Sequence, residues 1–346
     1  MRPALKPGLE TVWRNRDTVQ IGIDPRRAIA LTGMRGAAGL LRLLDGSRDR
    51  HQVLDAARDL GMDAAAADRV LTLLAAAGAL DDFPAGGHGG LPAGTRSRLA
   101  PELATSSLAH RDADGGARVL ARRQAARVRV HGASRASLGI AGLLYAAGVG
   151  LVLSTGPAVP RPGPAGSRGT RPANPAQAPI AGDDTGDHIL LWSPTPTPAK
   201  DTRRHPDLVV LADTHRRELP AVLVRRVVPH LAASASEAIG VVGPLVLPGR
   251  TACLRCLDLA RAERDPAWPL ILAQLASQAG ADPPACDTVL ATMVAAQAAA
   301  QALAFLDLGA EAAAVTNGTL ELVLPDWQWR RRTWEPHPQC GCHRPD

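Results

Sequence analysis

The sequence predicts an α/β protein in which a small α+β module precedes a larger domain built on a mostly parallel sheet. Three observations lead to this prediction. The chain has 346 residues, more than the roughly 250–300 that one hydrophobic core serves. A Gly-rich, polar segment interrupts it after about residue 83, as linkers do. Beyond residue 118, strand-like runs alternate with helix-like segments, the order typical of α/β folds.

The predicted module spans residues 1–83. Three short strand-like runs lie within residues 9–31, and three helices follow, each ending at a glycine suited to a left-handed cap: Gly46, Gly61 and Gly78. Asp63 can cap the third helix, whose expected apolar face consists of Val70, Leu71, Leu73, Leu74 and Ala77. A small sheet with three helices is typical of a winged-helix-like module.

Residues 84–117 are expected to be a flexible linker, and residues 118–346 the larger domain. A strand at 126–131, a helix at 136–147 and a strand at 149–153 form a βαβ beginning. A Pro-rich insert at 155–180 is expected to be a loop or disordered. The remaining expected elements are strands at 189–192, 208–212 and 240–247, helices near 214–226 and at 287–306, and a final strand pair starting at 319–324.

Composition narrows the classes of partner. Aromatic residues make up only 3% of the chain, so base-stacking platforms for single strands are not expected. The charge of +6 comes from scattered arginines, which is no nucleic-acid signature. No apolar signal-peptide core follows Met1, so a cytoplasmic protein is predicted. Residues 136–160 lack charge and could span a bilayer, but glycines interrupt the run, so we favour a buried strand-helix-strand and predict no membrane partner.

Five cysteines in such a compartment are better explained as metal ligands or reactive thiols than as disulfides. Cys253 and Cys256 form a CxxC, and Cys340 and Cys342 a CxC. Two close pairs supply the closed tetrahedral shell of a structural zinc site. The alternatives are unrelated thiols or a redox CxxC. Cys286, before the long helix, is either an activated nucleophile or a small buried hydrophobe.

Residues 132–139 lie between the first strand and helix of the α/β domain, where nucleotide-binding folds place a phosphate turn. Gly132 and Gly139 bound the turn, Arg135 could face a phosphate, and Asp213 after a strand could hold Mg²⁺. Ser134 and Ser137 stand where such turns have glycines, and no acidic residue follows the second strand. We therefore predict a degenerate site, with binding of ATP and Mg²⁺ as the alternative.

Four segments carry a resemblance to a known family: Cys253-Leu254-Arg255-Cys256, Asp265-Pro266-Ala267-Trp268-Pro269, Asn317-Gly318-Thr319-Leu320-Glu321-Leu322 and His337-Pro338-Gln339-Cys340-Gly341-Cys342. With them, the chain resembles the ThiF-type, ubiquitin-activating-enzyme-like superfamily over nearly its whole length. More closely, it resembles the actinobacterial cyclodehydratase-associated, leader-peptide-binding branch of ribosomal peptide (RiPP, TOMM) biosynthesis. The resemblance implies a Rossmann-like domain and, in active superfamily members, ATP-dependent adenylation of a carboxyl terminus. Asp213 matches the metal-binding Asp of those enzymes, and Arg135 loosely their Arg.

In the peptide branch, the resemblance implies that the N-terminal module captures a leader peptide as an added strand beside its third strand and third helix. Arg27 and Ile29 on that strand, and Arg69 and Leu73 on that helix, are the candidate peptide-binding residues. The predicted function is a non-catalytic scaffold that presents a precursor peptide to a YcaO-type cyclodehydratase for azoline formation. The alternatives are an ATP-dependent adenylyltransferase and a winged-helix DNA-binding regulator; a homodimer stays open.

Overall fold

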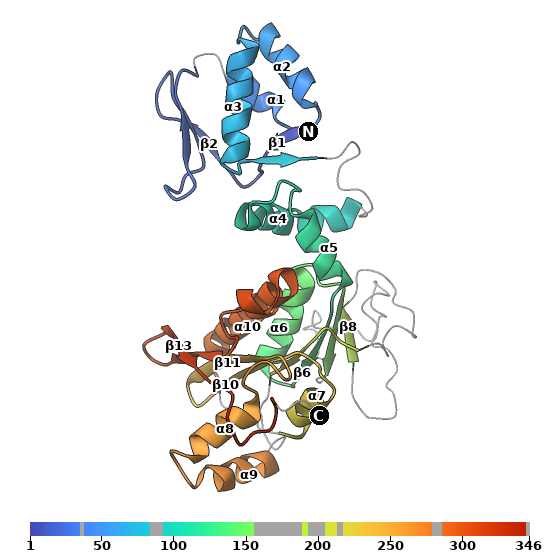
Figure 1. The fold of residues 1–346 in the computed structure, drawn as a ribbon, viewed down its shortest axis with the longest axis vertical. Coiled ribbons are helices and arrows are strands. Elements are labelled where there is room, and N and C mark those ends of the chain that lie inside the picture. The colour runs from blue at the N-terminus through green and yellow to red at the C-terminus, as the bar shows by residue number, and fades with distance from the viewer. Residues whose placement is uncertain are drawn as a thin grey trace, which may run out of the picture. The chain divides into compact units, whose positions relative to one another are not determined.

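The computed structural model describes residues 1–34, 38–83, 93–155, 189–192, 205–212, 217–278 and 286–343. The predicted insert at 155–180 therefore lies outside the described residues except for Thr155, and Asp213 lies outside them as well. The chain divides into two compact units, Met1–Ala121 and Arg122–Asp346, which Figure 1 draws in blue to green and in green to red.

The first unit contains a three-stranded antiparallel sheet in the order β2-β3-β4. A second, two-stranded antiparallel pair, β1 with β5, was not anticipated from the sequence and joins residues 3–5 to residues 80–82. The elements are β1 (Pro3–Leu5), β2 (Thr11–Trp13), β3 (Val19–Ile21), β4 (Ile29–Leu31), α1 (Ala38–Leu43), α2 (Arg50–Asp59), α3 (Ala64–Ala76) and β5 (Leu80–Asp82). The three strands and three helices agree with those expected, and the winged-helix-like assignment stays a prediction.

The ends of α2 and α3 follow the predicted glycine caps, whereas α1 ends at Leu43, three residues before Gly46. Gly46, Gly61 and Gly78 all have positive φ, at 78°, 78° and 70°, a conformation that costs glycine little. Asp63 caps α3 by accepting from the backbone of Ala66. The apolar face of α3 is narrower than predicted, because Leu71 and Leu74 are buried against β3 and β4 whereas Leu73 is 57% exposed and Ala77 is exposed as well.

The prediction of a flexible linker over 84–117 is wrong for most of that segment. Residues Ala93–His110 form α4 and Ala117–Ala125 form α5. Pro101 inside α4 and the absence of a regular apolar stripe hid this helix. Tertiary packing holds it, because Leu99 and Leu103 of α4 are buried together with Leu120 of α5.

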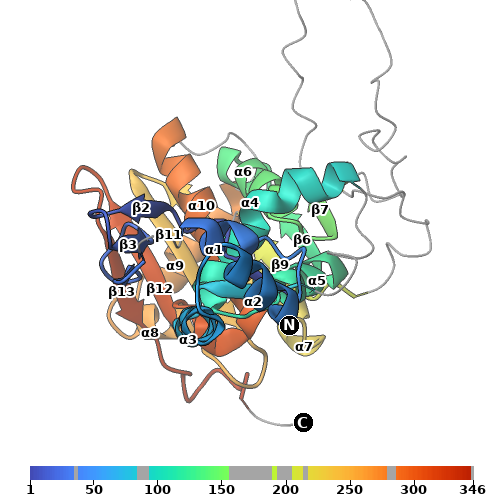
Figure 2. The same cartoon turned by 90° about the horizontal axis from the view of Figure 1, so that it is seen from above.

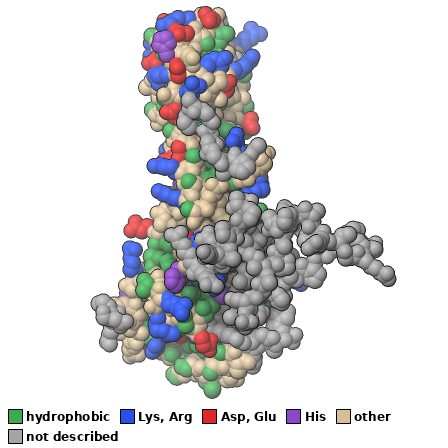
Figure 3. Space-filling view, turned by 90° about the vertical axis from the view of Figure 1, so that its right-hand side faces the viewer, with side chains coloured by type: hydrophobic (Ala, Val, Ile, Leu, Met, Phe, Trp, Pro, Cys, Tyr) green, Lys and Arg blue, Asp and Glu red, His purple; other side chains and the backbone are tan. Residues whose placement is uncertain are grey.

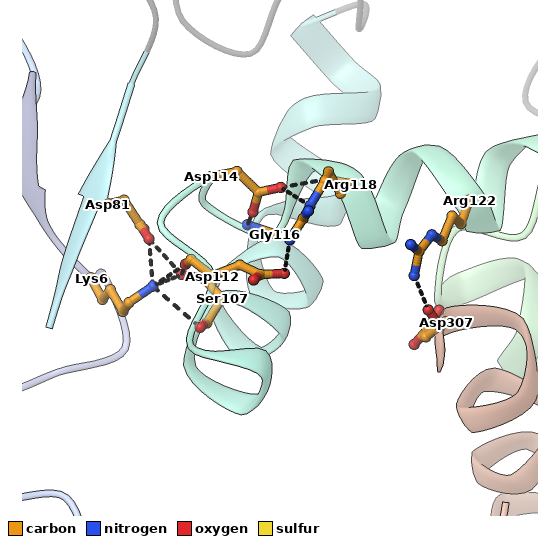
Figure 4. A network of polar contacts seen from close by, with 9 residues as sticks. All are labelled: Lys6, Asp81, Ser107, Asp112, Asp114, Gly116, Arg118, Arg122 and Asp307. Carbon is orange, nitrogen blue, oxygen red and sulfur yellow. Dashed lines mark hydrogen bonds and ion pairs between the residues drawn. The ribbon is translucent and has the colours of Figure 1, made fainter. Parts of the chain in front are cut away.

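A buried ion pair joins α4 to the strand pair β1–β5. Lys6 Nζ lies 2.6 Å from Asp81 Oδ1, and the two side chains are 0% and 1% exposed. Nζ also donates to the hydroxyl of Ser107 and to the Asp112 carbonyl at 2.6 Å, as Figure 4 shows. The ammonium is thus fully satisfied, which a buried charge requires.

In the second unit, the described strands form one eight-stranded sheet in the order β13-β12-β11-β10-β9-β6-β7-β8. The sheet is mixed, which corrects the expectation of a mostly parallel one. Only the neighbours β10–β9, β9–β6 and β6–β7 are parallel. The strands are β6 (Arg127–His131), β7 (Leu151–Thr155), β8 (Ile189–Trp192), β9 (Leu208–Leu211), β10 (His230–Ser236), β11 (Ile239–Val246), β12 (Gly318–Val323) and β13 (Trp329–Thr333).

Two hairpins, β10–β11 and β12–β13, contribute to the antiparallel half of the sheet. β10, which the sequence analysis missed, turns into β11 through Glu237 and Ala238, both with positive φ at 53° and 59°. Two-residue hairpin turns usually contain Asn-Gly or Asp-Gly. Because this turn contains neither, the hairpin had no local signal in the sequence. β12 and β13 form the expected final pair. β13 is an edge strand whose Arg330, Arg331 and Arg332 are exposed.

Helices cover both faces of the sheet. α6 (Arg135–Ala146) and α10 (Thr288–Leu308) pack side by side over one face, as Figures 1 and 2 show. α7 (Glu218–Arg225) and α8 (Leu254–Ala262) cover the other, and α9 (Trp268–Gln278) packs on α8. Residues along β9 alternate between the two cores, Leu208 and Val210 towards α6 and α10, and Val209 and Leu211 towards α7 and α8.

α10 is the one described helix long and apolar enough to cross a membrane, and 44% of its apolar window is buried within the fold. Its Leu290, Val294 and Ala298 belong to the same buried cluster as α6. A core helix of this kind passes the same length test as a spanning helix. A short 3₁₀ turn, Ala310–Ala312, follows it.

Candidate metal centre

The four predicted cysteine ligands converge in the second unit. Cys253 occupies the N-cap position of α8, and Cys256 lies in the first turn of that helix. Cys340 and Cys342 follow β13, with Gly341 between them at φ 74°. Their ligand atoms all lie within 4.8 Å of one another. The two pairs that the sequence separates by more than eighty positions thus form one cluster.

The cluster has the dimensions of a zinc site. Zn–S bonds of about 2.3 Å in a tetrahedron place sulfurs about 3.8 Å apart. Cys253 Sγ lies 3.8 Å from Cys256 Sγ and 3.5 Å from Cys340 Sγ, and Cys256 Sγ lies 3.3 Å from Cys342 Sγ. Four thiolates would complete the shell and leave no position for a water, so the ion would stabilise the fold and not activate a nucleophile.

Without a bound cation, the cluster favours the thiolate form at one cysteine, Cys256, and disfavours it at Cys253 and Cys342. Hydrogen bonding from the Cys253 thiol lowers the pKa of Cys256 to about 4, and the backbone of His337 assists it. The pKa of Cys253 is raised by the same hydrogen bond and by burial. Burial chiefly raises the pKa of Cys342 to about 12. Four crowded thiolates need a cation, and a divalent ion supplies one.

Contacts around the cluster hold residues 334–343 against the sheet. Trp334 is buried with Cys253, Cys256 and Cys340, and its indole Nε1 donates to Thr319 Oγ1 at 2.9 Å. His343, which follows Cys342, lies with Nε2 3.1 Å from the Thr251 carbonyl. The backbone of His337 also contacts the cluster. The sequence analysis did not predict this role, and the position of His337 just before the CxC motif was the one feature that could have indicated it.

The predicted phosphate turn is closed by its own side chains. Ser134 caps α6 by accepting from the Ser137 backbone at 3.3 Å, and the Ser137 hydroxyl donates to the Ser134 carbonyl at 2.7 Å. Arg135 Nη1 donates to Thr288 Oγ1 at the start of α10 at 2.9 Å. These contacts use groups that a phosphate would need.

The two predicted turn glycines have conformational or packing roles. Gly132 has φ 137°. A Cβ at Gly139 would lie 2.8 Å from Cβ of Ala295, so this glycine lets α6 and α10 approach closely. Burial raises the pKa of the half-buried Cys286 thiol, with the charge of Asp287 adding to the effect, which opposes activation as a nucleophile. Asp287 itself caps α10.

The candidate peptide-binding residues lie in the first unit. Arg27 precedes β4, is exposed, and its Nη1 lies 3.3 Å from the Leu108 carbonyl of α4. Ile29 on β4 packs against the buried cluster that contains Leu71 and Leu74. Arg69 and Leu73 are exposed on α3. β4 and α3 therefore pack on the same buried core of the first unit, and α3 exposes a polar and an apolar side chain to solvent.

No family model matches the sequence, and no curated protein matches it either. Solved structures do match. Escherichia coli MccB with ATP has a TM-score of 0.61 and 14% identity, and the match covers 99% of this chain and 99% of that chain. This chain has the MccB fold. The microcin C7 biosynthetic enzyme MccB in complex with N-formylated MccA matches at a TM-score of 0.61 and 14% identity, over 99% of this chain and 100% of that chain.

The MccB fold also occurs within a longer protein. The heterocyclase TruD matches at a TM-score of 0.58 and 17% identity, over 99% of this chain but only 42% of TruD. A heterocyclase in complex with substrate and cofactor matches at 0.61 and 15% identity, over 99% of this chain and 39% of that chain. These likenesses establish the fold, which agrees with the α/β architecture of the ThiF-type resemblance.

Proposed function

We propose that this protein is a scaffold that binds the leader segment of a ribosomal precursor peptide and presents it to a separate YcaO-type cyclodehydratase, which forms azolines. One observation carries the proposal: β4 is an edge strand of its sheet, with β3 on one side and no strand on the other among the described residues. Such an edge offers unpaired backbone groups to an extended peptide.

Two exposed side chains of α3, the helix that shares a buried core with β4, suit a peptide. Leu73 exposes 57% of its surface on α3, and the guanidinium of Arg69 has no partner among the residues that the structure describes. An added strand would place alternate side chains towards the helix, where an apolar residue could cover Leu73 and an acidic one could meet Arg69.

The solved relatives support this direction. TruD is a heterocyclase, and MccB has been solved with N-formylated MccA. This chain matches only 42% of TruD. The proposal therefore assigns the modifying activity to a separate protein. The self-capped turn at Ser134 and the Arg135–Thr288 contact favour a scaffold over an adenylyltransferase.

The test uses the full chain and a labelled precursor peptide encoded beside its gene, followed by fluorescence anisotropy. Leu73→Glu and Arg69→Glu are expected to weaken binding at least about tenfold, because each removes a complementary contact worth about 1.4 kcal/mol or more. Leu60→Glu is the matched control, since Leu60 is 50% exposed on the C-cap of α2.

Equal binding by all three variants would contradict a peptide site at β4 and α3. Saturable, Mg²⁺-dependent binding of labelled ATP with release of pyrophosphate would replace the proposal by the adenylyltransferase alternative.

A further inference from the structure

A second surface lies entirely in the second unit, on the face of the sheet covered by α7 and α8. α7, α8 and α9 line a groove of ≈ 570 Å³, and Cys253, Cys340 and Cys342 of the cysteine cluster are also among its lining residues. Its volume is within the range of binding sites, about 300–1,000 Å³. Most of the lining is apolar, and it includes Pro220, Val224, Leu254, Leu259, Trp268 and Leu272.

The apolar surface continues beyond the groove onto α9. This helix carries no charged residue, yet Leu270 is 65% exposed and Ile271 is 38% exposed. Isolated exposed leucines are ordinary, but a contiguous apolar helix bordering an apolar groove marks an interaction site. Figure 3 shows hydrophobic side chains at the lower end of this unit, where Figure 1 places α9. A small molecule confined to the groove would leave this outer surface uncovered.

The charges around the groove are unbalanced. Among the described residues that line it, the one carboxylate is Asp258, which is already held by Arg217 at 2.7 and 3.0 Å and by the Trp268 indole at 3.2 Å. Arg225 and Arg255 also line the groove, are exposed, and have no side-chain partner among the described residues. The groove therefore presents an apolar floor with Arg225 and Arg255 beside it, and no described carboxylate neutralises these two side chains.

We propose that this groove docks an acidic amphipathic helix of a partner protein, whose leucine-like side chains fill the space between α7 and α9 and whose carboxylates pair with Arg225 and Arg255. Helix-in-groove recognition joins these two features, apolar anchors and flanking charge. A second copy of the chain fits less well, because a two-fold contact would bring the same arginines towards each other. The inference does not depend on the proposed function, because every residue involved lies in the second unit.

The test measures binding of two labelled helical peptides, about fourteen residues long, to the full protein by fluorescence anisotropy. Both carry leucines at i, i+3, i+4 and i+7, and their flanking positions are all Glu in one and all Lys in the other. We expect the Glu peptide to bind at least about tenfold more tightly. Arg225→Glu with Arg255→Glu should reverse the preference, and Leu272→Glu should abolish binding of both peptides.

Arg226→Glu is the matched control, because Arg226 is the exposed neighbour of Arg225 in sequence but does not line the groove, and it should keep the wild-type preference. Equal affinity for the two peptides, or a preference that survives the charge reversal, would overturn the proposal. So would a dimer of the protein alone that Leu272→Glu dissociates. Precursor-peptide binding by the same variants reports on the first unit, so failure of either proposal can be recognised separately.

Discussion

His230 is a buried titratable side chain without a role at the sites described above. It begins β10, is 0% exposed, and its Nδ1 lies 3.0 Å from the Val228 carbonyl, an acceptor that fixes Nδ1 as the protonated nitrogen. Nε2 has no hydrogen-bond partner among the described atoms. Burial, opposed only by the Val228 contact, lowers its pKa from 6.5 to about 4.

This lowered pKa predicts acid sensitivity in a defined range. Below pH 6.5 the unfolded chain binds a proton at His230, whereas the folded chain resists it until about pH 4. Stability is therefore complete above pH 6.5 and is lost as the pH falls towards 4, by at most about 3 kcal/mol. His230→Asn keeps a donor for Val228 and should flatten this part of the pH profile, measured by thermal unfolding between pH 7 and 4.5. An unchanged slope in the variant would contradict the assignment.

At the scale of elements, the Lys6–Asp81 pair decides how α4 is held against β1 and β5. Lys6→Met leaves the Asp81 carboxylate buried without a cation, which we expect to cost about 3–5 kcal/mol in urea unfolding. The control is Arg26→Met, which breaks a pair whose side chains are 88% and 47% exposed and should change nothing measurable. If both variants unfold alike, the buried pair does not stabilise this unit.

Elements with a local signal could be predicted from the sequence. Glycine caps marked the ends of α2 and α3, and Asp287 marked the start of α10. α4 and β10 had no such signal, because α4 contains Pro101 and β10 turns at Glu237 and Ala238. Their formation depends on partners far away in the chain, such as Lys6, which donates to Ser107 of α4. Strand direction was missed for the same reason, since the hairpin that reverses β11 is specified by tertiary pairing.

At the candidate sites, the sequence spacing of the cysteines was enough to predict the metal cluster. A CxxC and a CxC indicated a four-sulfur cluster, which the geometry confirms. The groove between α7 and α9 was missed, because its walls come from three helices of which α8 and α9 were not anticipated. The uncharged run from Trp268 to Ser277 was its only trace in the sequence.

At the scale of the whole molecule, the cysteine cluster predicts a response confined to one unit. Removal of zinc by a chelator, or Cys253→Ser with Cys256→Ser, should speed hydrogen exchange in residues 251–263 and 334–343 and lower the unfolding temperature of that unit. Structural zinc contributes on the order of 10–16 kcal/mol in small peptides. Residues 1–83 hold no ligand of the cluster and should exchange as before.

The matched control for this experiment is Cys286→Ser, because Cys286 lies outside the cluster and its loss should leave the exchange pattern unchanged. Purified protein that contains no bound metal and keeps its stability in the double cysteine variant would exclude the zinc site.

The edge strand β13 has a consequence for solubility. A free sheet edge can recruit strands from other molecules and start aggregation. Three exposed arginines in a row, Arg330, Arg331 and Arg332, lie on this edge strand. Arg330 pairs with Asp326 and Arg332 lies 4.0 Å from Glu321, so the row keeps a net positive charge. A second copy approaching along β13 would bring its own arginines against them, so the protein is guarded against growing into fibrils from this side of the sheet.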